Sequence, residues 1–218
     1  MSKRKARNKT WGSVLIRWLP FFVCMALIPR VDTSTRSSVI RSQDTTINVV
    51  EYLNERSVNY MSFNPRQFRE LIYDTLEIII PEYNSPEAVE LLMLTAAQES
   101  FLGRFIKQLY CGVAKGVFQM EMATYNDLFD SYIRYKPDLQ NKLFHYFPVN
   151  EETADLMMCG NLPYQIVIAR LNYYRKRGNI PHVEDINGLA EYYKKHWNTH
   201  LGAATVKEAL RNYWKYAR

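Results

Sequence analysis

Residues 88–100 of this 218-residue chain read AVELLMLTAAQES, and this stretch decides how the domain is built. Its apolar residues recur at helical spacing, which predicts a helix with its apolar side in the core. Glu99 and Ser100 close the stretch, so one carboxyl group falls where a buried helix gives way to a loop. Because burial disfavours the charged form of a carboxyl group, we expect Glu99 to have a raised pKa and to hold a proton near neutral pH.

A loop with two glycines follows this helix. Residues 112–120 read GVAKGVFQM, with Gly116 three residues before Gln119. Glycine lets a loop turn sharply and lets its backbone approach a ligand closely. The combination of Glu99-Ser100 with Gly116-x-x-Gln119 is more specific than either part alone.

These residues resemble the signature of soluble lytic transglycosylases and goose-type lysozymes, a family whose members cleave peptidoglycan. The resemblance implies a mainly α, lysozyme-like domain in which Glu99 is the general acid. It also implies that Gly116, Gln119 and Met120 line the substrate cleft. Ser100 would orient Glu99 or contact a sugar.

A third element of the family is an Ala-Tyr-Asn-Ala-Gly segment downstream of the glutamate. Residues 169–174, which read ARLNYY, occupy that place but lack the Asn-Ala-Gly order. The sugar-contacting role implied by the resemblance therefore has three candidates, Asn172, Tyr173 and Tyr174.

Two further segments resemble bacteriophage proteins that contain this domain. They are residues 119–127 (QMEMATYND) and residues 189–199 (LAEYYKKHWNT). The resemblance as a whole covers about residues 85–215. It implies a phage enzyme with peptidoglycan as substrate and other virion proteins as further partners, located in the virion or at the host inner membrane facing the periplasm.

Cleavage of the β-1,4 bond between N-acetylmuramic acid and N-acetylglucosamine needs a proton donor at the leaving oxygen and commonly a second carboxylate. The resemblance implies that the 6-hydroxyl of muramic acid can replace the second carboxylate and give a 1,6-anhydro product. Glu121 is the candidate for a second acidic group that binds substrate or positions a water. The alternative for Glu121 is a charge that favours the start of the next helix. An anhydro and a hydrated product both stay open.

The positive charge of the chain is confined to its N-terminal part. The formal net charge is +6, and residues 1–45 hold nine basic and two acidic residues. Residues 46–218 hold nineteen basic and twenty acidic residues. A nucleic-acid-binding face on the folded domain is therefore not expected, and a basic N-terminal arm that binds nucleic acid is a weaker alternative.

Residues 1–29 combine a basic cluster with an apolar run, the order of a membrane-targeting segment. The run is interrupted by Arg17 and Pro20 and is shorter than the roughly twenty residues that span a bilayer. An uncleaved signal anchor, a cleaved signal peptide and an interfacial anchor are three alternatives. An arm that packs on a partner inside a virus particle is a fourth. We favour an N-terminal anchor-like helix.

Residues 30–46, rich in Ser, Thr and Arg, predict a tether. Helical periodicity is nearly continuous over residues 47–218, so we expect one mainly α domain there. The pairs Asn-Pro at 64–65 and Ser-Pro at 85–86 each place a capping residue before a proline suited to a first helical turn.

Four further helices are predicted at residues 87–105, 162–177, 184–197 and 205–216. The apolar stripe of the last one is more typical of core packing than of a ligand site. We therefore expect this helix to pack against the rest of the domain.

No metal site or cofactor is expected, because the cysteines and histidines lack the spacing of a zinc site. A disulfide between Cys111 and Cys159 would require an oxidising compartment, and two buried free thiols are the alternative that we favour. A rival to the enzyme hypothesis is a non-catalytic virion or membrane-associated structural protein that retains a lysozyme-like scaffold.

Overall fold

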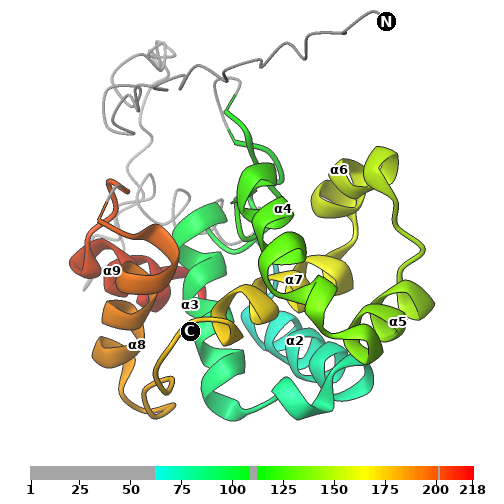
Figure 1. Cartoon of the computed structure of the whole chain (residues 1–218). Coiled ribbons are helices and arrows are strands. Elements are labelled where there is room, and N and C mark those ends of the chain that lie inside the picture. The colour runs from blue at the N-terminus through cyan, green and yellow to red at the C-terminus, as the bar shows by residue number, and fades with distance from the viewer. Residues whose placement is uncertain (1–61, 109–111, 201) are drawn as a thin grey trace, which may run out of the picture. The chain divides into compact units, whose positions relative to one another are not determined.

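The computed structural model describes residues 62–108, 112–200 and 202–218. This part of the chain is mainly helical and adds one short hairpin, which confirms the mainly α character that the sequence predicted (Figure 1). The predicted anchor at 1–29, the tether at 30–46 and Cys111 lie outside the described residues. Within the described part, none of the helices combines the length and the apolar character that crossing a bilayer requires.

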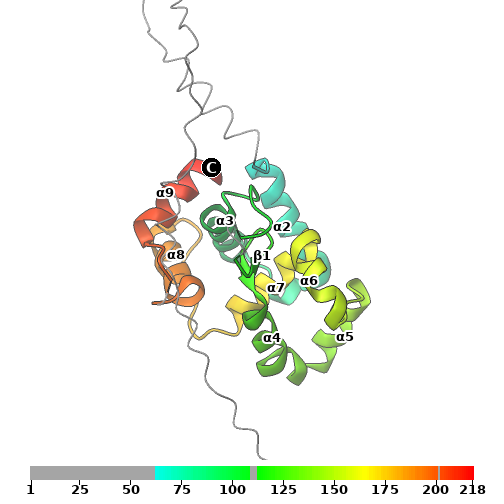
Figure 2. The same ribbon diagram turned by 90° about the horizontal axis from the view of Figure 1, so that it is seen from above.

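Helix α3 lies at the centre of the domain. The helices that contact it are α2 (Pro65–Ile79), α7 (Leu162–Tyr174), α8 (Ile186–Tyr193) and α9 (Val206–Tyr216). Figure 2 shows α3 (Pro86–Ser100) with α8 and α9 on one side and α2 and α7 on the other. All residues from Ala88 to Ala97 are buried, as expected for a helix that neighbours cover all round.

The remaining elements surround this centre. They are η2 (Pro81–Tyr83), β1 (Ala114–Lys115), β2 (Met120–Glu121), α4 (Met122–Ser131), η3 (Ile133–Tyr135), α5 (Pro137–Tyr146), α6 (Glu151–Gly160) and the π-helical η4 (Lys194–Asn198). Strands β1 and β2 pair antiparallel and form the hairpin. Helices α4 and α6 contact α7, and α5 contacts α2.

The predicted helix starts are confirmed by their caps. The side chain of Asn64 accepts a hydrogen bond of 3.1 Å from the Gln67 backbone N–H at the start of α2. Ser85 Oγ accepts one of 3.1 Å from the Ala88 N–H at the start of α3. Each bond satisfies a backbone donor that has no partner within its helix.

The predicted helix over 87–105 was too long at its C-terminal end, because α3 ends at Ser100. Phe101 and Leu102 have φ values of 52° and 58°, the left-handed conformation that reverses the chain after a helix. The Leu102 N–H donates to the Ala96 carbonyl at 3.0 Å, and the Leu102 side chain is fully buried. Burial of this leucine favours the reversal over further helical turns.

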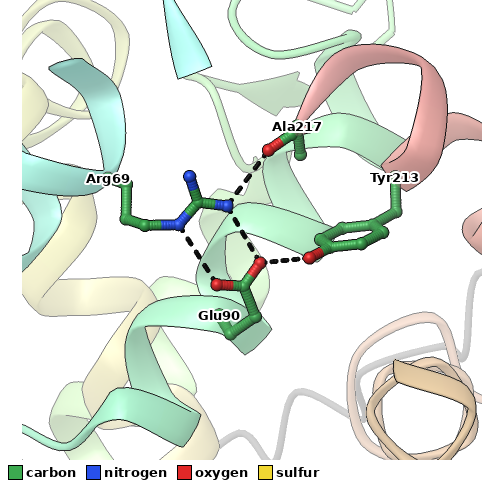
Figure 3. A network of polar contacts seen from close by, with 4 residues as sticks. All are labelled: Arg69, Glu90, Tyr213 and Ala217. Carbon is green, nitrogen blue, oxygen red and sulfur yellow. Dashed lines mark hydrogen bonds and ion pairs between the residues drawn. The ribbon is translucent and has the colours of Figure 1, made fainter. Parts of the chain in front are cut away.

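The last helix is tied to the centre of the domain by a polar network around Glu90 (Figure 3). Arg69 Nε and Nη2 donate to the Glu90 carboxylate at 3.1 and 3.0 Å, and Nη2 also donates to the Ala217 carbonyl at 3.0 Å. The Tyr213 hydroxyl of α9 donates to the same carboxylate. The network joins α2, α3 and α9, in agreement with the expected packing of the last helix.

Candidate active site

Glu99 lies on the last turn of α3 and is half-buried. Its Oε1 accepts a hydrogen bond of 2.6 Å from the hydroxyl of Tyr193, a fully buried residue of α8. Among the described residues, no Lys, Arg or His forms an ion pair with Glu99. The carboxyl group therefore has one strong donor and no neutralising cation.

Burial raises the pKa of Glu99 to about 7, and the hydrogen bond from Tyr193 lowers it by a smaller amount. The raised pKa expected from the sequence is thus present in the structure. A carboxyl group with such a pKa can give up a proton in one step of a reaction and take one back in the next.

Aromatic side chains enclose the last turns of α3. The hydroxyls of Tyr173 and Thr95 lie 2.7 Å apart, and Thr95 donates its own proton to the Leu91 carbonyl. Tyr173 is therefore the donor of the pair. Its ring centroid lies 5.0 Å from that of Trp197, a half-buried residue of η4. Tyr173 thus links the last turns of α3 to the ring of Trp197.

Tyr193 and Trp197 received no role from sequence reasoning, although they lie in the segment 189–199 that resembles phage proteins. Tyr193 is 94 residues from Glu99 in the chain. No local signal in the sequence pointed to this contact, and the structure adds that the segment ends in the π-helical turn η4. Such turns are rare and occur frequently at functional sites.

Ser100 is fully buried and holds the turn after α3. Its Oγ donates to the Ala96 carbonyl at 3.1 Å and accepts from the Gly103 N–H at 2.8 Å. Both partners are backbone groups. The structure thus gives Ser100 a role in shaping the loop, and neither expected role, orienting Glu99 or contacting a sugar, is supported by these contacts.

Gly116 begins the turn between β1 and β2 and has a φ of 73°. A Cβ here would press on the Met158 carbonyl oxygen and would lie 2.5 Å from Gln165 Oε1. The same Gln165 oxygen accepts a hydrogen bond of 2.7 Å from the Val117 N–H. Glycine is therefore required because helices α6 and α7 pack directly against the turn.

Gln119 closes this turn in a left-handed conformation, with φ of 46°. Its Nε2 donates to the Gly116 carbonyl at 2.7 Å, and the residue is half-exposed, so it remains accessible to a ligand. Met120 is buried and packs in the core. Phe118 lies between these regions, with its ring centroid 6.4 Å from that of Trp197. The turn is thus connected by packed rings to the residues around Glu99.

Glu121 ends β2 directly before α4 and is half-exposed. It forms no side-chain hydrogen bond to the start of α4, although it occupies the capping position. Burial raises the pKa of Glu121 above its ordinary value. Glu121 thus stands at the start of α4, where its charge can favour the positive end of the helix as in the alternative interpretation, and the second acidic group remains a prediction.

The third motif is mostly internal. Asn172 is buried, and its Oδ1 accepts a hydrogen bond of 3.1 Å from Arg175 Nε. Tyr174 is about half exposed and packs edge-on against Tyr83. Of the three candidates, only Tyr173 contacts the last turns of α3, and its hydroxyl is occupied by Thr95. Asn172 and Tyr173 therefore support the site from within, and the structure gives neither an exposed surface for a sugar.

The described residues contain no group of three or more His, Cys, Asp or Glu side chains arranged to hold a metal ion. Cys159 is a buried free thiol. The Tyr192 and His196 rings lie 4.3 Å apart, so this histidine packs against an aromatic ring on its own helical segment.

Comparisons of the chain with family models, with curated proteins and with solved structures found no match.

Proposed function

We propose that this domain is a lysozyme-like, peptidoglycan-cleaving lytic transglycosylase with Glu99 as its general acid and base. The observation that carries the proposal is the environment of Glu99. The carboxyl group lies at the end of a buried helix, accepts one hydrogen bond from Tyr193, and has a pKa of about 7 because of burial. Perturbed carboxyl groups of this kind are characteristic of general acids in glycosidases.

The proposed reaction begins with protonated Glu99. It donates its proton to the oxygen of the β-1,4 bond while the bond from that oxygen to the anomeric carbon of N-acetylmuramic acid breaks. The carboxylate then accepts the proton of the muramic acid 6-hydroxyl as this oxygen bonds to the anomeric carbon. The products are a 1,6-anhydro sugar and a free 4-hydroxyl, and Glu99 is protonated again.

Tyr193 acts as a positioning residue in this scheme. Its hydroxyl fixes one oxygen of Glu99 and stabilises the carboxylate that forms after proton transfer. Gln119 is the accessible residue of the hairpin turn that can contact a sugar. Glu121 offers a route to hydrolysis, in which its carboxylate would activate a water in place of the 6-hydroxyl.

The biological setting that we propose is local opening of the cell wall by a phage. The basic and apolar residues 1–29 would anchor the domain at the inner membrane or in the virion, and residues 30–46 would give it reach. Peptidoglycan would be met on the periplasmic side.

A second candidate is a non-catalytic virion or membrane-associated protein that retains the scaffold. The burial of Asn172 and Tyr173 favours it, because these residues then serve packing rather than sugar binding. Such a protein would bind sacculi without releasing soluble fragments.

The test uses the full chain, its Glu99→Gln variant and a Glu191→Gln control. Glu191 is exposed on α8, so its amide should leave the rate unchanged. Release of dye-labelled fragments from peptidoglycan sacculi should fall at least about a thousandfold in Glu99→Gln, a loss of roughly 4 kcal/mol in transition-state stabilisation. Circular dichroism should show the same helical content in all three proteins. Undiminished release by Glu99→Gln would overturn the assignment of the general acid.

A further inference from the structure

A pocket of about 690 Å³ opens at the start of α3, at the opposite end of this helix from the candidate general acid. Its wall includes Glu87 of α3, Arg170 and Tyr174 of α7, Lys176 just beyond α7, and Tyr192 of α8. The volume lies in the range of small-molecule sites in proteins. Charged and aromatic side chains thus converge on a cavity to which the proposed reaction assigns no role.

Arg170 is the most informative residue of this wall. It is only 6% exposed, and its Nε donates to the Tyr83 carbonyl at 2.6 Å. The guanidinium carbon lies 5.2 Å from the centroid of the Tyr174 ring. Among the described residues, no carboxylate pairs with Arg170 and its two terminal nitrogens have no hydrogen-bond acceptor.

A comparison with Glu90 shows why this is unusual. Glu90 and Arg170 are the two charged side chains buried within the described part of the chain. Glu90 is compensated by Arg69 and Tyr213, whereas burial lowers the pKa of Arg170 and no carboxylate offsets that cost. A buried charge is normally paired, and among the described residues Arg170 has no anionic partner. Its terminal nitrogens are not among the fully enclosed polar atoms without a partner, so they remain accessible to a ligand in the pocket.

The other charged side chains of the pocket wall indicate which charges a ligand of this pocket would carry. Lys176 is half-buried and adds a second cation. Glu87 is half-buried, and no cation of the described residues forms an ion pair with it. Two cations and one unpaired carboxylate favour a ligand that carries both carboxylate and ammonium groups over a simple anion.

We propose that this pocket binds the carboxylate-bearing end of a peptidoglycan stem peptide, with Arg170 and Lys176 holding its carboxylates and Glu87 its side-chain amine. This inference rests on the proposed function, because that function supplies the substrate polymer. Tyr174 and Tyr192 offer ring surfaces for the aliphatic part of the peptide.

The reach of a stem peptide fits the separation of the two sites. Glu87 precedes Glu99 by twelve residues, which is about 18 Å along an α-helix. An extended peptide of five residues spans up to about 17 Å. Two adjacent residues of α8 connect the sites, since Tyr192 lines the pocket and Tyr193 donates to Glu99. A stem attached to a muramic acid near Glu99 would therefore enter the pocket from the side of Tyr192, and the wall at Glu87 lies at the limit of its reach.

The test measures binding of free tripeptides to the full chain by isothermal titration calorimetry. The probes are L-Ala-γ-D-Glu-diaminopimelate, the same peptide with amidated carboxyl groups, the same peptide with an acetylated side-chain amine, and acetate. Lys176→Met and Glu87→Gln are the test variants, because replacement of the buried Arg170 could disturb folding. Lys207→Met, which removes an exposed lysine on α9, is the control.

We expect the unmodified tripeptide to bind, and amidation or Lys176→Met to weaken binding at least tenfold, with Lys207→Met unchanged. Glu87→Gln should weaken the free amine peptide and leave the acetylated one unaffected. Absence of binding, equal binding of acid and amide, or acetate binding as tight as the tripeptide would overturn the inference. Sacculus cleavage without peptide binding would contradict only the pocket, and peptide binding without cleavage would contradict only the catalytic proposal.

Discussion

Glu90 and Glu99 lie on the same helix, and their surroundings differ in one decisive respect. Glu90, in the middle of α3, is held by both nitrogens of the Arg69 fork and by Tyr213 (Figure 3). Glu99, at the end of α3, has one hydroxyl donor and no cation among the residues that the structure describes, and its pKa is raised to about 7. The difference is the arginine. Glu90 is paired with Arg69 and stabilises the fold, whereas a carboxyl group without a neighbouring cation can take up and release a proton near neutral pH.

The largest loss of stability is expected from replacing Glu90, the glutamate that is paired with Arg69. Glu90→Gln removes the charge that neutralises Arg69 and should lower the free energy of unfolding by about 3–4 kcal/mol, because a partner charge is left uncompensated. Urea denaturation would measure the loss. Glu87→Gln, at the half-buried first turn of the same helix, is the matched control and should cost only about 0.5 kcal/mol. Equal losses in the two variants would contradict the account of the network.

The hairpin turn at Gly116 should be the next most sensitive. Gly116→Ala introduces a Cβ against the Met158 carbonyl and Gln165 in a left-handed backbone, at an expected cost of about 2–3 kcal/mol. Gly178 also has a positive φ but open space around a Cβ, so Gly178→Ala should cost only about 1 kcal/mol. Thermal unfolding of both variants would separate collision from backbone strain. A cost for Gly116→Ala no greater than that for Gly178→Ala would contradict the close packing.

The raised pKa of Glu99 should make the free energy of unfolding depend on pH. The folded-state pKa of about 7 exceeds the ordinary value of 4.5, so the native protein keeps a proton that the unfolded chain has released between these values. The stabilisation is therefore complete below pH 4.5 and is lost as the pH rises to about 7. Glu99→Gln cannot ionise, so its stability relative to the unmodified protein should rise by on the order of 2 kcal/mol over this interval.

Urea denaturation at several pH values would measure this difference. Glu191→Gln, in an exposed position, should follow the unmodified protein at every pH. A constant difference between Glu99→Gln and the unmodified protein would mean that Glu99 is not protonated near neutrality.

The smallest effect is expected at the hydrogen bond that Glu99 accepts from Tyr193. The bond from Tyr193 lowers the pKa of Glu99, so Tyr193→Phe should raise that pKa further. The alkaline limb of the activity profile should move to higher pH, and the maximal rate should fall about tenfold as the carboxyl group loses its orientation. Tyr135→Phe, which removes a hydroxyl from an exposed tyrosine of η3, serves as the control. An unshifted limb in Tyr193→Phe would show that Tyr193 does not tune Glu99.

Local signals in the sequence predicted the parts of this fold that depend on neighbouring residues. The caps Asn64 and Ser85 and the central position of α3 follow from residue types and spacing within one turn or one helix. The end of α3 was placed too late, because the reversal at Phe101 depends on where Leu102 is buried. That information lies in the packed structure and not in the helical period.

In the candidate site, too, some residues could be predicted from local sequence and others depend on tertiary packing. Glu99 and Gly116 could be named from motifs, and the need for glycine became clear only from the packing of Met158 and Gln165. Tyr193 could not be named, because its bond to Glu99 joins residues 94 positions apart. The buried positions of Ser100 and Asn172 were missed for a related reason, since short motifs do not report which face of a helix is covered.

The most direct measurement is mass spectrometry of the soluble products after sacculi are incubated with the full chain or with its Glu99→Gln variant. The account predicts muropeptides with 1,6-anhydro ends from the unmodified protein and none from the variant. Hydrated reducing ends would indicate hydrolysis, with Glu99 still the general acid and Glu121 the candidate for the carboxylate that activates water. Absence of products from the unmodified protein, or equal products from both proteins, would contradict the central claim that Glu99 is the proton donor of a peptidoglycan-cleaving enzyme.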